Sequence, residues 1–86
     1  MEPVIFDTYK DEIVKKINEN VINLGLLKDP LGFSILEGFI NIPFQPVLDG
    51  GINLGGPTVP GVAIVARSTG MIHYFALKAL LPNIKI

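Results

Sequence analysis

The stretch GVAIVARSTGMIHYFALK, residues 61–78, decides the fold because it reads as two β-strands joined by a tight turn. Residues 68–70, Ser-Thr-Gly, have the length and the final glycine expected of a three-residue hairpin loop whose last residue is left-handed. Residues 62–66 are apolar on both faces, which predicts a strand central in a covered sheet or packed against another subunit. The second strand alternates, with Met71, His73, Phe75 and Leu77 on one face and Ile72, Tyr74, Ala76 and Lys78 on the other.

Upstream of the hairpin, residues 8–24 predict an amphipathic helix. Asp7 or Thr8 is suited to cap its N-terminus, and Gly25 is a natural stop at its C-terminus. Polar side chains fill one side of this helix. The apolar residues recur at helical spacing and form the opposite side: Ile13, Val14, Ile17, Val21 and Leu24.

The segment between helix and hairpin predicts a turn, one strand and a long loop. The turn is LKDPLG at 27–32, and the strand runs over 33–42, with Gly38 as a candidate bulge. Two prolines, Pro43 and Pro46, are expected to end regular pairing, so that residues 43–60 form the loop. At the two ends of the chain, residues 4–6 are a candidate extra strand, residues 78–82 a closing helical turn, and residues 83–86 an edge strand or tail.

This order of elements predicts an α+β fold in a single domain, residues 1–86. One N-terminal amphipathic helix packs on a small, mainly antiparallel sheet of three to four strands that ends in a C-terminal β-hairpin. A single helix covers only one face of such a sheet. The second face is therefore expected to be open, and a dimer would cover it by pairing sheets or edges.

Composition favours a protein that buries a face against a partner. The chain is 49% hydrophobic but only 17% charged, below the roughly 25% charge of an average soluble domain. A net charge of −1 provides no field that would attract nucleic acid. The acidic N-terminus lacks a secretory pattern, and no uncharged run is a good membrane helix, so we expect a cytoplasmic protein without a membrane span.

The loop segment LDGGINLGGPTVPG, residues 48–61, holds five of the nine glycines and invites comparison with phosphate-binding loops. It has neither the Gly-Lys-Ser/Thr ending nor a following helix, so a structural or interface loop is the favoured interpretation. Asp49 lies in an Asp-Gly-Gly turn that lacks the hydroxyl of an aspartic-protease half-site. We expect its carboxylate to bond within its own turn.

No metal or cofactor site is expected. The chain has no cysteine and a single histidine, His73, which excludes thiolate sites and a multi-histidine site within one subunit. On a strand face, His73 is expected to be packed, with general-base catalysis as its functional alternative. Candidate ligand-binding residues near the hairpin and the loop are Arg67, His73, Tyr74 and Asn53.

Three hypotheses of function follow, in decreasing order of support. The first is a small self-associating assembly module, a dimer or larger homo-oligomer, that buries its apolar β-rich body and the glycine/proline loop. The second is a regulatory domain in which the 43–60 loop folds over a small-ligand pocket. The third is a hydrolase that uses Asp49 and His73 at a subunit interface.

Overall fold

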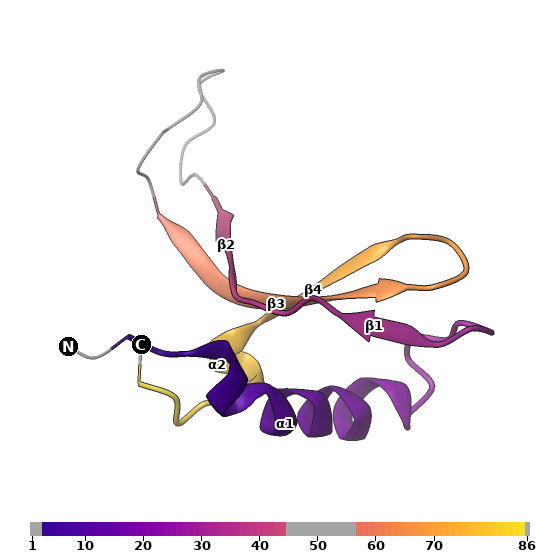
Figure 1. The fold of residues 1–86 in the computed structure, drawn as a ribbon, viewed down its shortest axis with the longest axis horizontal. Helices are drawn as coiled ribbons and strands as arrows, with labels where there is room; N and C mark the ends of the chain where they lie inside the picture. The colour runs from indigo at the N-terminus through magenta and orange to yellow at the C-terminus, as the bar shows by residue number, and fades with distance from the viewer. Residues whose placement is uncertain (1–2, 45–56, 86) are drawn as a thin grey trace, which may run out of the picture.

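The computed structural model describes residues 3–44 and 57–85 and shows an α+β fold, as the sequence predicts (Figure 1). A four-stranded antiparallel sheet lies over the helices. Its elements, in chain order, are α1 (Phe6–Ile17), the π-helix η1 (Asn18–Ile22), β1 (Phe33–Ile35), β2 (Ile40–Pro43), β3 (Thr58–Ala66), β4 (Ile72–Ala76) and α2 (Leu77–Leu80).

Strand β3 is the centre of the sheet, because every other strand pairs with it and all pairs are antiparallel. β1 and β2 pair with the two ends of β3, at Phe33↔Ala66 and Ile40↔Gly61, and β4 pairs along Gly61–Val65. Residues 62–64 and Ala66 are buried, which agrees with the expectation that this apolar run is central.

The predicted C-terminal hairpin is β3–β4, and its turn contains the expected left-handed glycine. Gly70 has φ +76°. The Ala66 N–H donates to the Met71 carbonyl at 2.9 Å, so the last bonded pair of the hairpin is Ala66 with Met71. The loop between them is residues 67–70, one residue longer than the predicted loop 68–70. The Gly70 N–H donates to the Ala66 carbonyl at 2.8 Å, so the loop is a single helical turn ended by the glycine.

The segment predicted as one strand over residues 33–42, with Gly38 as its candidate bulge, forms two short strands, and the interruption lies at Glu37 and Gly38 as that candidate indicated. Leu36 donates to the Ala63 carbonyl at 3.0 Å, whereas Ile40 lies opposite Gly61. Residues 37–39 therefore oppose Val62 alone, and the chain bends at Glu37 and Gly38. The bend turns Phe39 toward the helix, where its ring meets Phe6 edge-on at 5.4 Å between centroids.

The predicted loop 43–60 is too long at both ends, because Pro43 ends β2 and residues 58–60 belong to β3. Pro43 in β2 and Pro60 in β3 both occupy positions at which the strand does not need an N–H group to bond to a neighbouring strand. Backbone groups alternate in direction along a strand, so the Pro43 nitrogen points away from β3, to the outer edge of β2. The Pro60 nitrogen points to the side of β3 on which β4 pairs, but at a place beyond the end of β4. Residues 45–56 of this loop, including Pro46, lie outside the described residues.

The N-terminal helix begins earlier than predicted and changes type before it ends. Ile5 is its N-cap and no side chain caps it, so the expected caps at Asp7 and Thr8 and the expected strand at residues 4–6 are wrong. Phe6, buried against Phe39, is already in the first turn. The packing of this ring explains the early start.

After Ile17 the predicted helix continues as a π-helix over Asn18–Ile22 and then as a turn, with hydrogen bonds from the Asn23 N–H to the Asn18 carbonyl and from the Leu26 N–H to the Val21 carbonyl. The wider turn rotates later residues off the apolar stripe. Leu24, expected on the buried side, is consequently 67% exposed. Gly25, with φ +72°, follows as the predicted stop.

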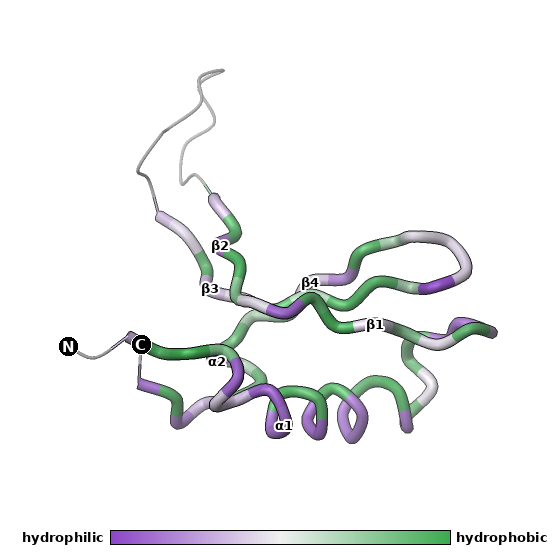
Figure 2. Tube along the Cα trace, viewed as in Figure 1, coloured by the Kyte–Doolittle hydropathy of each residue, from purple (hydrophilic) through white to green (hydrophobic). Residues whose placement is uncertain are grey.

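The core lies on one face of the sheet only, between the strands and the helices (Figures 1 and 2). In Figure 2 the side of α1 toward the sheet is hydrophobic and the far side hydrophilic. α2 is the expected closing helical turn, and residues 81–85 form a tail in which Ile84 is buried. The core residues are Phe6, Ile13, Ile17, Val62, Ile64, Leu77, Leu80, Leu81 and Ile84.

Candidate functional site

The candidate site is the sheet face that points away from α1. Successive residues of a strand point to opposite faces, so the side of β3 opposite Val62 and Ile64 is formed by Gly61, Ala63 and Val65. The register then assigns the neighbouring strands to that face. We call this surface the open face; its residues are Ser34, Leu36, Ile40, Ile42, Val59, Gly61, Ala63, Val65, Ile72, Tyr74 and Ala76.

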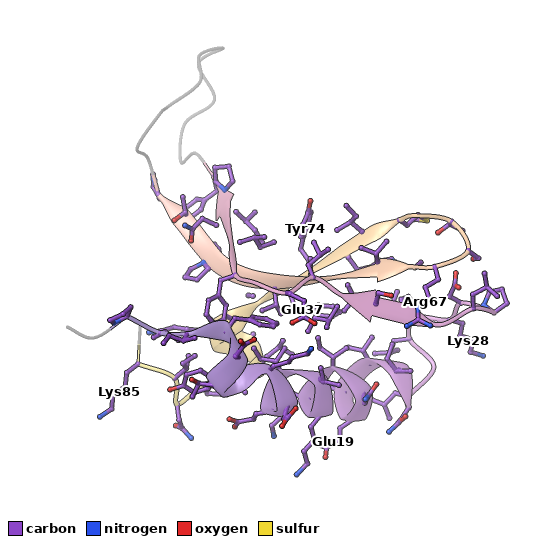
Figure 3. The ribbon with its side chains drawn as sticks, viewed as in Figure 1. Glu19, Lys28, Glu37, Arg67, Tyr74 and Lys85 are labelled. Atoms are coloured by element: carbon purple, nitrogen blue, oxygen red, sulfur yellow. The ribbon has the colours of Figure 1, made fainter. Side chains whose placement is uncertain are left out.

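Apart from the hydroxyl groups of Ser34 and Tyr74, the open face is apolar, although no described element covers it. Tyr74 is 58% exposed, Ile72 48% and Leu36 40%. Figure 3 shows the Tyr74 side chain standing on the side of the sheet away from α1. An antiparallel sheet with one solvated face normally carries polar side chains there. This sheet departs from that pattern.

Charged side chains within residues 33–44 and 57–76 are Glu37 and Arg67, and neither lies within the open face. Glu37 bonds to Lys10 of α1 at 2.5 Å, on the helix side of the sheet, and this hydrogen bond raises the pKa of the Lys10 amine. Arg67 lies in the hairpin loop, where its Nε donates to Ser34 Oγ at 2.8 Å. Among the described residues, the open face therefore carries no charged side chain of its own, and the Arg67 cation lies at its rim, bonded to Ser34 of that face.

A groove of about 350 Å³ crosses the open face between β2 and Tyr74, lined by Ile40, Asn41, Ile42, Pro43 and Tyr74. Gly61 lies beside it on β3. A Cβ atom at Gly61 would lie 2.8 Å from the Phe75 carbonyl oxygen and 3.2 Å from Ile42 Cδ1. The absent side chain therefore lets β2 and β4 approach β3 closely.

At one end of the sheet, Asp29 connects the turn before β1 to the hairpin loop by hydrogen bonds. Its carboxylate accepts from the Leu31 N–H at 3.0 Å, from the Ser68 N–H at 3.2 Å and from the Ser68 hydroxyl. The Ser68 hydroxyl is the main reason that the pKa of Asp29 is lowered. Sequence analysis missed this contact: the Asp-Pro turn signals Asp29, but nothing local indicates a partner 39 residues away.

The structure does not bring the candidate ligand-binding residues together. His73 is half-buried on the helix side of β4, where its ring meets Phe33 edge-on at 6.1 Å between centroids. Tyr74, the next residue, points to the open face. Arg67 is bonded to β1 through Ser34, and its N–H donates to the Gly32 carbonyl at 3.0 Å.

The other candidates, Asp49 and Asn53, lie outside the described residues, as does most of the 43–60 loop. No distance between Asp49 and His73 is therefore defined. The ligand-binding and hydrolase hypotheses stay predictions.

Two further hollows occur in the described structure. One, of about 230 Å³, opens between the end of α1, the π-helix and β1 and is mostly apolar, with Asn18 in its lining. The other, of about 350 Å³, lies between α1 and the C-terminal tail. Within residues 3–44 and 57–85, no three potential metal ligands cluster, and no helix has the length and hydropathy to cross a bilayer.

Comparison with known proteins found no similar one: no protein-family model, no curated protein and no solved structure matches this chain.

Proposed function

We propose that this chain is a small self-associating interaction module that buries its open face against a second copy. The observation that carries the proposal is an uncharged, apolar sheet face with no described element over it. Burying a large apolar side chain contributes roughly 1.5–3 kcal/mol, so such a face favours association. Exposed contiguous apolar surface is typical of an interaction site.

The charge distribution supports a second copy as the partner. In a two-fold contact the same surface meets itself, so any charge within it approaches its own copy or requires an opposite charge nearby. The described residues of the open face carry no charge, and Arg67 at its rim is bonded to Ser34. A self-contact therefore brings no like charges together.

Tyr74 is the expected anchor of this contact. It is the most exposed large side chain of the open face and stands beside the groove over β2. Tyrosine is enriched among residues that dominate binding energy, because its ring is large and has few rotatable bonds. A Tyr74 ring from the other copy would occupy part of this 350 Å³ hollow.

The test compares two exposed leucines by sedimentation equilibrium. Leu36→Lys places a charge in the open face, whereas Leu24→Lys places the same charge after the π-helix, at a residue 67% exposed. We expect Leu36→Lys to weaken self-association at least about tenfold. Leu24→Lys should leave it unchanged.

A wild-type chain that remains monomeric up to about 1 mM contradicts the proposal, since contacts of biological use are normally tighter. Equal weakening by both leucine variants would also contradict it. That result would mean that added charge, and not the open face, controls association.

A further inference from the structure

The outer edge of β4 carries unpaired backbone groups at alternate residues. The Ala66 N–H bonds to the Met71 carbonyl, which fixes Met71, His73 and Phe75 as the residues whose backbone groups point toward β3. The N–H and C=O groups of Ile72 and Tyr74 and the N–H of Ala76 therefore point outward and are unpaired, whereas the C=O of Ala76, the N-cap of α2, accepts the first hydrogen bond of that helix. In the described part of the chain, β4 pairs with β3 alone.

The two edges of the sheet differ in how they are protected against pairing. The β1–β2 edge is broken by the bend at Glu37 and Gly38 and ends in Pro43, whose nitrogen faces outward and cannot donate. Short strands, bends and prolines are the features by which proteins prevent edge association. β4, with the sequence IHYFA, has no proline, no Lys, Arg, Asp or Glu, and an unbroken register over five residues.

We propose that β4 pairs antiparallel with β4 of a second copy, about a two-fold axis at Tyr74. In this register Tyr74 lies opposite its own copy, and Ile72 lies opposite the other chain's Ala76. The two Tyr74 residues then exchange two hydrogen bonds, and the Ala76 N–H of each chain donates to the Ile72 carbonyl of the other, which gives about four hydrogen bonds between the chains.

Side-chain chemistry agrees with this register. On the open-face side the two Tyr74 rings become direct cross-strand neighbours, and aromatic cross-strand pairs are favourable. On the helix side His73 lies opposite the second copy's Phe75. No Lys, Arg, Asp or Glu occurs in β4, so two-fold pairing places no like charges opposite each other.

The edge contact uses backbone groups of β4, whereas the proposed function uses side chains across the sheet. An antiparallel edge pair keeps both sets of helices on one side and joins the two open faces into a wider one. The two contacts are compatible in one assembly, a face-to-face pair of eight-stranded sheets with four chains. Each can nevertheless fail without the other.

Residue-resolved amide hydrogen exchange tests the edge contact directly. For the free chain the register predicts protected amides at His73 and Phe75, which face β3, and fast exchange at the outward amides of Ile72, Tyr74 and Ala76. We expect the Tyr74 and Ala76 amides to become at least about tenfold slower as the chain concentration rises through the association range. Fast exchange of these two amides in an associated chain overturns the edge contact and leaves the open-face contact standing.

Protection of the outward amides that does not depend on concentration also overturns the proposal. It would mean that a part of the same chain occupies the edge. Protection seen only after an unrelated extended peptide is added would assign the edge to a different partner and overturn pairing between copies.

Cysteine cross-linking tests the register, and the chain contains no cysteine of its own. Opposed residues in a hydrogen-bonded antiparallel pair have Cα atoms about 5.5 Å apart, within the range a disulfide spans. Tyr74→Cys should therefore form a disulfide dimer under mild oxidation. Ile72→Cys should not form a disulfide dimer, because its two copies lie four residues apart along the paired strands. The double variant Ile72→Cys with Ala76→Cys should form one, because in this register residue 72 lies opposite residue 76 of the other chain.

The cross-linking variants are made in the Leu36→Lys background, in which the open-face contact is weakened. A Tyr74→Cys dimer that persists there supports the edge contact, and one that disappears with Leu36→Lys assigns the proximity to the open face and overturns the edge register. Equal cross-linking of Tyr74→Cys and Ile72→Cys also overturns it.

Discussion

Gly61 lies where β3 passes between β2 and β4, and the absence of a side chain there allows the close approach. We expect Gly61→Ala to destabilise the fold by about 1–3 kcal/mol, as overpacked positions do. The added Cβ would stand 2.8 Å from the Phe75 carbonyl oxygen, a backbone atom that cannot rotate away. Urea denaturation of the dilute chain measures the change.

Gly38 provides the matched control for this substitution. A Cβ there meets no atom within 4 Å, and its φ is not positive. Gly38→Ala should change the free energy of unfolding by no more than about 0.5 kcal/mol. A similar loss for both alanine variants would show that the close approach at Gly61 is not what matters.

Asp29 gives the fold a defined acid sensitivity. The Ser68 hydroxyl lowers the pKa of this carboxyl below its ordinary value of 3.8, so the ionised form is favoured in the folded state. Its stabilising contribution is present above the unfolded pKa and is lost as pH falls through the lower folded pKa. We therefore expect wild type to melt at a higher temperature than Asp29→Asn above about pH 5, and the difference to shrink below pH 4.

The Ser68→Ala background is the control for this pH dependence. Without the hydroxyl, the largest cause of the lowered pKa is removed. In that background, the change in melting temperature caused by Asp29→Asn should vary less with pH. An undiminished pH dependence would show that another group lowers the pKa.

At the scale of the element, the backbone N–H and C=O groups of strand β4 point alternately toward β3 and away from it, just as its side chains point alternately to the two faces of the sheet. The His73 N–H points toward Ile64, whereas the Ile72 N–H points outward. Proline removes one N–H, so its effect depends on which way that group points. The natural prolines in β2 and β3 follow the same rule, since their nitrogens face no strand.

We expect His73→Pro to reduce the free energy of unfolding by at least about 2 kcal/mol more than Ile72→Pro, because it breaks a ladder bond and orphans a carbonyl. Chemical denaturation of both variants at concentrations where the chain is monomeric makes the comparison. Equal destabilisation would mean that the register deduced from the Ala66–Met71 hydrogen bond is wrong.

At the scale of the whole molecule, the uncharged open face determines how self-association responds to solution conditions. Association by apolar burial has a negative heat-capacity change and weakens on cooling. It should also depend little on salt, since screening acts on charges. We expect dilution calorimetry to show the association constant changing less than about threefold between roughly 0.05 and 0.5 M NaCl.

An association that weakens steeply with salt would contradict this expectation. It would indicate contacts between charged side chains, which are concentrated in the first third of the chain. The interface would then involve α1 and not the sheet.

The sequence by itself determined the features that depend on local periodicity. The alternation of residues 71–77 predicts the two faces of β4, and Gly70 predicts the left-handed end of the hairpin loop. Ile13 and Ile17 predict the buried side of α1. These predictions hold because a strand repeats every two residues and a helix about every 3.6, whatever lies elsewhere in the chain.

Only the tertiary structure decided which residues oppose each other across β3. The split of residues 33–42 into β1 and β2, the place of Pro60 within a strand and the Asp29–Ser68 contact all follow from that register. The early start of α1 likewise depends on Phe6 meeting Phe39, 33 residues away. The sequence predicts an open face, because one helix covers only one side of a sheet. The sequence does not predict the groove on that face or the difference in protection between the two edges of the sheet, since both arise from contacts between segments distant in sequence.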